Sequence, residues 1–259
     1  MRMRPWVSVS RFLAVLAAAF LLSAPASALT LSDLSLTVTS GTGQVTLGDL
    51  TGSSYDPNDP NWTVELANNT GATYAPGPNW ELNSWDVKAN ADPAVAAILG
   101  VVNLGLTPRT FTITFTANVG PQGPSTLTSG RVTDALGSIT LLSGTLSSIS
   151  GTPVYSALID GSPVHTLLND PFSATNSAFN DQFGGPGAVL LGLVPAPTVP
   201  GPAVSNTIGI RLTFALNPGA AVGIGAAFVV EPVPEPTTVL LLAFGLGGLA
   251  VAGSSRRRA

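Results

Sequence analysis

The sequence predicts an all-β protein, an antiparallel β-sandwich of the jelly-roll type. Apolar residues alternate with polar ones in many short windows, which is the pattern of a strand with one buried face. The 259 residues also include 28 Gly and 22 Pro, which favour turns and interrupt helices. A hydrophobic fraction of 45 % with only 9 % charged residues is too apolar for a disordered chain. Because Cys is absent, the domain has to be stable through its core alone.

The alternation is clearest in five windows, at residues 34–38, 62–66, 111–115, 208–216 and 222–230. The last two flank Asn217-Pro218-Gly219, so we expect them to pair as a hairpin. A second turn is predicted at Asp160-Gly161-Ser162-Pro163, between strands at 154–159 and 164–168.

Two further apolar segments do not alternate. Residues 188–194 are continuously apolar and predict a fully buried strand. Residues 93–99 begin with Pro and predict one short helical turn. No tandem repeat and no long amphipathic helix precede the C-terminal tail, so we expect one domain over residues 29–231.

The N-terminus has the three parts of an export signal. Arginines at positions 2, 4 and 11 precede or border an apolar run at residues 12–22. Small residues follow, with Ala26 and Ala28 at the −3 and −1 positions of a cleavage site. We therefore predict a signal peptide over residues 1–28, with a signal helix that signal peptidase removes after Ala28.

The C-terminus has the features of a second targeting signal. Pro234, Glu235 and Pro236 precede an uncharged apolar run at residues 237–253 and a basic end formed by Arg256, Arg257 and Arg258. Seventeen helical residues extend about 25 Å, at the short end of what a bilayer requires. The arginines mark the cytoplasmic end. The prolines hold an extended stem on the outer side, where Glu235 is accessible.

These three parts, in this order, resemble the PEP-CTERM sorting signal, here over residues 232–259. The resemblance implies that exosortase, an integral membrane cysteine protease, recognises Pro234-Glu235-Pro236 and removes or transfers the tail. It also implies a Gram-negative-type bacterium that makes exopolysaccharide, and an inner-membrane-anchored precursor that then moves to the cell surface or outside. A plain C-terminal membrane anchor is one alternative interpretation. A lipid-anchor signal of the eukaryotic type is the other, although such a signal normally ends in its apolar tail and not in arginines.

Charge excludes one class of partner. Between the two addresses, residues 29–236 contain four cations and all 14 acidic residues, a formal charge of −10. An acidic body repels nucleic acid, so we expect no nucleic-acid partner.

No catalytic constellation is evident. His165 is the only histidine, and without Cys a zinc site would need carboxylates for its other ligands. Asp160 or Asp170 could complete a triad with His165, but no Gly-x-Ser-x-Gly turn presents a nucleophile. A carboxylate pair for glycoside cleavage depends on spatial separation, which the sequence does not give. Glu65 is expected on the solvated side of its strand.

Two candidate binding sites remain. Asp56, Asn58, Asp59 and Asn61 are oxygen-bearing residues of the kind that calcium prefers, although Asx-Pro sequences also form ordinary turns. Trp80 and Trp85 are five residues apart, so on one strand they would face opposite sides and one could stack on a sugar. The alternative is that both pack in the core.

The sequence therefore predicts an exported surface or extracellular-matrix protein, structural or adhesive, associated with exopolysaccharide or biofilm. We expect no enzymatic activity and no cofactor apart from the calcium option. The alternatives are a secreted glycan-binding module, with or without calcium, and a hydrolase on a sandwich scaffold.

Overall fold

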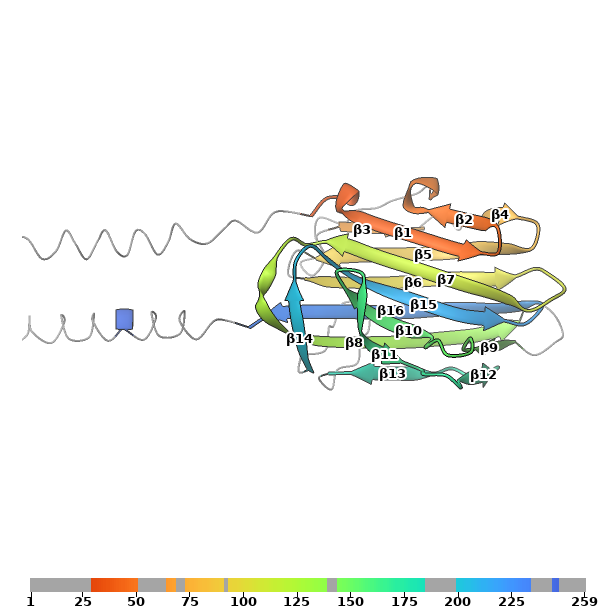
Figure 1. The fold of residues 1–259 in the computed structure, drawn as a ribbon. Helices are drawn as coiled ribbons and strands as arrows, with labels where there is room; N and C mark the ends of the chain where they lie inside the picture. Colours follow the sequence, from red (N-terminus) through yellow and green to blue (C-terminus); the bar gives the residue numbers. More distant parts are fainter. Residues whose placement is uncertain are drawn as a thin grey trace, which may run out of the picture.

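The computed structural model describes residues 29–50, 64–68, 73–90, 93–138, 144–184, 199–233 and 244–246. Within these ranges the chain forms two antiparallel sheets and two single 3-10 turns, η1 (Leu31–Asp33) and η2 (Leu47–Asp49) (Figure 1). The all-β prediction is confirmed. The signal helix predicted for residues 1–28 lies outside the described residues.

The first sheet has the spatial order β11-β10-β15-β7-β1-β2, with β9 beside β15 and β12 beside β9. Its strands are β1 (Leu34–Ser40), β2 (Gly43–Thr46), β7 (Arg109–Asn118), β9 (Thr145–Ser147), β10 (Tyr155–Ile159), β11 (Ser162–Leu167), β12 (Ser173–Thr175) and β15 (Thr207–Leu216).

The second sheet has the order β13-β8-β16-β6-β5-β3, with β14 beside β8 and β4 beside β5. Its strands are β3 (Val64–Ala67), β4 (Tyr74–Gly77), β5 (Trp80–Asn90), β6 (Ala94–Asn103), β8 (Gln122–Ser138), β13 (Asn180–Phe183), β14 (Val199–Val204) and β16 (Ala220–Pro232).

The two sheets pack face to face on one hydrophobic core. Trp80 of the second sheet meets Phe111 of the first edge to face at 5.6 Å, and Phe111 stacks on Phe214 at 5.7 Å between ring centroids. Tyr155 on β10 donates a hydrogen bond of 2.9 Å across the core to the carbonyl of Ala227 on β16. The five alternating windows, where described, direct their apolar residues into this core as predicted.

The predicted hairpin at Asn217-Pro218-Gly219 is wrong. β15 pairs with β7 and β10 in the first sheet, whereas β16 pairs with β6 and β8 in the second. The turn therefore carries the chain from one sheet to the other. Both strands alternate, and alternation shows which side of a strand is buried but not which strand lies beside it.

The predicted helical turn at residues 93–99 is also wrong. Residues from Ala94 onward belong to β6, a central strand whose residues are buried on both faces except at Ile98. Burial on both faces removes the alternation that identifies a strand. The turn predicted after residue 159 is confirmed, since Asp160 and Gly161 connect β10 to β11 with positive φ angles of 50° and 77°.

The described ends of the domain lie at the same end of the two sheets. The start of β1 is paired with the end of β7, and the last residue of β16 is paired with the first half of β8 (Figure 1). The turns at residues 41–42, 104–108 and 217–219 lie at the opposite end.

Candidate functional site

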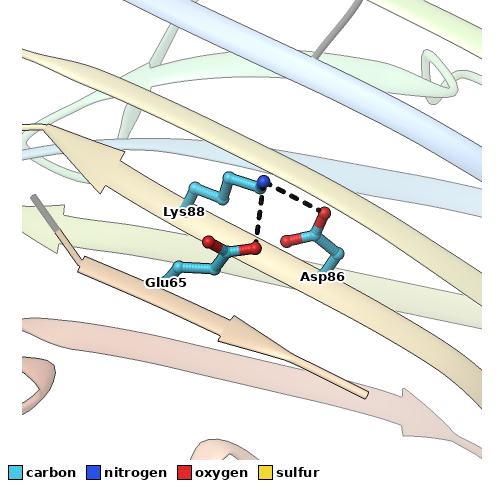
Figure 2. A network of polar contacts seen from close by, with 3 residues as sticks. All are labelled: Glu65, Asp86 and Lys88. Carbon is cyan, nitrogen blue, oxygen red and sulfur yellow. Dashed lines mark ion pairs between the residues drawn. The ribbon is translucent and has the colours of Figure 1, made fainter. Parts of the chain in front are cut away.

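A charged cluster lies on the outer side of the second sheet, formed by Glu65, Asp86 and Lys88 (Figure 2). Glu65 on β3 is directly opposite Lys88 on β5, and Asp86 precedes Lys88 by two residues on the same face. The Lys88 Nζ lies 3.0 Å from Glu65 Oε1 and 3.4 Å from Asp86 Oδ2. The Glu65 side chain is only 14 % exposed, so the expectation that it is a solvated charge is wrong.

Burial and ion pairing act in opposite directions on the pKa values of Asp86 and Lys88. Burial raises the pKa of Asp86 to about 6, against the attraction of Lys88 and with the repulsion of Glu65. Burial disfavours the Lys88 ammonium, but its hydrogen bond to Glu65 and the charges of both carboxylates outweigh this, and its pKa is raised. Asp86 Oδ1 is buried and has no hydrogen-bond partner among the described residues.

The geometry of the cluster is that of an ion network. A glycosidase needs two carboxyl groups on either side of a substrate bond, one to protonate it and one to attack or to activate water. Here one ammonium contacts both carboxylates, so Lys88 rather than a substrate bond occupies the position between them. The cluster therefore gives no positive support to a hydrolase.

The expectation that Trp80 or Trp85 is exposed is wrong. Their exposed fractions are 2 % and 3 %, and both side chains belong to the core. A β-bulge between Leu82 and Ser84 is the physical cause, since it adds a residue to β5 and reverses its alternation between the two tryptophans. Opposite the bulge, Gly100 leaves the space that Asn83 and Ser84 occupy.

The residues considered for a catalytic triad do not come together. His165 packs against Phe183 with the ring centroids 4.4 Å apart and the ring planes tilted by 34°, and burial lowers the pKa of His165. Asp160 accepts backbone hydrogen bonds from residues 205–207. Asp170 accepts one hydrogen bond from the Ser148 hydroxyl and one from the backbone N–H of Gly151. Both aspartates therefore stabilise loops.

Several predicted site residues lie outside the described residues. These are the calcium candidates Asp56, Asn58, Asp59 and Asn61, the cleavage-site residues Ala26 and Ala28, and the sorting residues Pro234, Glu235, Pro236, Arg256, Arg257 and Arg258. In the part of the chain that the structure describes, no group of three or more His, Asp or Glu side chains could hold a metal ion.

The stem of the C-terminal tail begins directly at the folded domain. β16 remains paired with β8 up to Pro232, one residue beyond the predicted boundary, and Val233 donates a backbone hydrogen bond of 3.0 Å to Ser125. Within the predicted membrane span, residues 244–246 are helical. Among the described residues no helix is long and apolar enough to cross a membrane, so the transmembrane helix stays a prediction.

The described part of the chain is an all-β domain whose last strand, β16, ends where the C-terminal tail begins. A family profile for the PEP-CTERM protein-sorting motif matches residues 232–258, so the chain carries this sorting signal and is directed to exosortase as an exported protein with a membrane-anchored precursor. No curated protein matches the chain.

The pairing of Glu65 with Lys88 is the feature that sequence reasoning missed. Asp86 and Lys88 share a face because they are two residues apart, which the sequence does indicate. Glu65 joins them only through the register of β3 on β5, and that register has no local signal.

Proposed function

We propose that this protein is a structural or adhesive component of the cell surface or extracellular matrix, associated with exopolysaccharide or biofilm and processed by exosortase. The observation that carries the proposal is the sorting motif at residues 232–258, which begins within the last strand of a folded β domain. Signal peptidase acts at the other end of the precursor.

The arrangement of the two ends supports this role. The start of β1 and the end of β16 lie at one end of the sheets, so an anchor that follows β16 places that end toward the membrane (Figure 1). The opposite end then faces outward, where Leu106 is 95 % exposed. The chain crosses between the sheets at residues 104–108, 119–121 and 217–219, and on this basis we interpret the fold as a jelly-roll-like sandwich.

The shortness of the stem in the sequence, from Val233 to Pro236, gives processing a second consequence. Because β16 leads into the stem at Pro232, the anchored precursor is held close to the bilayer. Cleavage at the tail therefore also releases the domain from the membrane. We propose a non-enzymatic role without a resident cofactor, supported by the engagement of Glu65, Asp86, Asp160 and Asp170 in structural contacts.

The test is replacement of Glu235 by Ala in an exosortase-positive host. We expect the wild-type protein to lose its tail and leave the inner membrane, and the Glu235→Ala protein to keep its full C-terminal mass in the membrane fraction. Glu231→Ala is the matched control, because Glu231 is an exposed glutamate four residues earlier. Normal processing of Glu235→Ala, measured by intact mass and fractionation, would refute the sorting role of the motif.

A further inference from the structure

The outer face of the first sheet is a continuous surface of hydroxyl groups. One row across the strands joins Thr46, Thr37, Thr114 and Arg211, and the next joins Gln44, Thr39, Thr112 and Thr213. Ser35 and Thr116 extend the surface in a third row. We call these ten residues the threonine face. Their neighbours in sequence, such as Val38 and Phe115, point into the core.

Strand propensity alone does not explain this face. Thr is favoured in strands in general, so the two sheets should share it equally. The outer side of the second sheet instead carries Glu65, Glu81, Asp86 and Lys88, small residues of β6 and β16, and Arg131 and Thr133 of β8. The threonines are therefore concentrated on one of two comparable surfaces.

Acidic residues are excluded from the same face. The region from residue 29 to residue 236 has a formal charge of −10, yet β1, β2, β7 and β15 contain no Asp or Glu. Asp49 lies at the rim, where it accepts a hydrogen bond of 2.7 Å from Thr46, on the edge away from Arg211. An anion approaching the centre of the face meets no carboxylate on these strands.

Arg211 is the cation of this face, directly opposite Thr114. In the described ranges the other cations of the body have partners: Lys88 binds two carboxylates, Arg131 donates to Asn180 Oδ1, and Arg109 donates to the Ser40 carbonyl. The Arg211 guanidinium has no protein acceptor among those residues. Arg211 is a half-buried residue beside Thr114, and its planar guanidinium is suited to bind a carboxylate in a bidentate manner.

We propose that the threonine face binds an acidic polysaccharide, with Arg211 on a sugar carboxylate and the threonine hydroxyls on sugar hydroxyls. Hydroxyls on this face repeat at about 4.8 Å across strands and about 6.8 Å along them, so an extended polymer meets a hydrogen-bonding group at short intervals. The carboxylates of the other surfaces repel the same polymer, so binding is confined to this face. The inference rests on the proposed association with exopolysaccharide and specifies its site and ligand class.

No aromatic side chain belongs to the face, so binding depends on hydrogen bonds and one ion pair. Such binding is weak for one molecule, sensitive to salt, and strengthened where many copies line one polymer. These properties are those of a matrix component.

The experiment is affinity electrophoresis of the full-length protein in detergent, through gels that contain polygalacturonate or neutral dextran. We expect polygalacturonate alone to retard the protein, and Arg211→Gln to weaken retention about tenfold, the loss of one charge-assisted contact. Arg131→Gln is the matched control, because Arg131 lies opposite Ala227 on the outer side of the second sheet and is followed two residues later by Thr133, as Arg211 is by Thr213. We expect it to bind as the wild type does.

A second pair of variants tests the hydroxyls. Thr114→Val keeps the shape of the side chain and removes its hydroxyl, and we expect retention to weaken about threefold, since a neutral hydrogen bond contributes less than a charged one. Thr133→Val on β8 should have no effect. Equal loss with Arg131→Gln, equal retention by dextran, or no retention at all would each overturn the inference. None of these results would alter the Glu235 processing experiment, so the two proposals can fail separately.

Discussion

Replacement of Lys88 by Met is expected to lower the free energy of unfolding at pH 7 by about 3–5 kcal/mol, the usual cost of leaving buried charges without their partner. The ammonium contacts both Glu65 and Asp86 at 3.0 and 3.4 Å, and the two carboxyl side chains are only 14 % and 26 % exposed. Because Met preserves the apolar part of the Lys88 side chain, the loss in the free energy of unfolding measures the effect of removing the ammonium charge. Urea denaturation of the purified protein measures it.

The deficit of Lys88→Met should shrink as the pH falls. A carboxyl group whose pKa is higher in the folded state favours folding at low pH, and this contribution is lost as the pH rises through the folded pKa. In the wild type this pKa is about 6 for Asp86, and removal of the neighbouring cation raises it further. The variant should therefore be more stable at pH 5 than at pH 7.

The control for this prediction is the triple variant Glu65→Gln, Asp86→Asn, Lys88→Met. It keeps side chains of similar volume and carries no charge, so we expect it to recover most of the stability at pH 7. If the single variant matched the wild type, or lost stability equally at both pH values, the network would have no energetic role.

The Glu65–Lys88 pair shows where sequence reasoning reaches its limit in this fold. Alternation identified the inward residues of β1, β7, β15 and β16, because every second residue of a half-buried strand is apolar. The choice of the neighbouring strand produces no comparable pattern in the sequence. The register of the strands places Glu65 opposite Lys88 and Thr37 opposite Thr114. Because β15 and β16 belong to different sheets, the segment predicted as their hairpin turn is a connection between the sheets.

The tryptophans show a second limit. A period of two holds only while a strand is regular, and one extra residue at Asn83 reverses it for the residues that follow. A bulge has no sequence signature comparable to a turn, and Gly100 on the partner strand became interpretable only once the bulge was known. The C-terminal sorting signal could be predicted without knowledge of the fold, because it is defined by the order of a motif, an apolar run and a basic cluster along the chain.

Replacement of Trp80 by Ala is expected to cost about 3–5 kcal/mol in the free energy of unfolding, as for other large aromatic side chains removed from a core. Trp80 is 2 % exposed and packs edge to face on Phe111, which in turn stacks on Phe214. The cavity would open between the two sheets, where neither can close it without moving against the other. Denaturant midpoints with an unchanged m-value would identify the loss as one of stability.

Trp85→Phe is the comparison that separates core packing from ligand binding. The Trp85 indole N–H is buried without a hydrogen-bond partner among the described residues. Removing this N–H therefore removes the free-energy cost of burying an unpaired donor, which offsets part of the cost of the lost side-chain volume. We expect a cost below about 2 kcal/mol and unchanged retention by polygalacturonate. If Trp80→Ala kept the wild-type stability while either tryptophan variant lost polysaccharide retention, recognition would take place at the aromatic residues and the threonine face would lose its role.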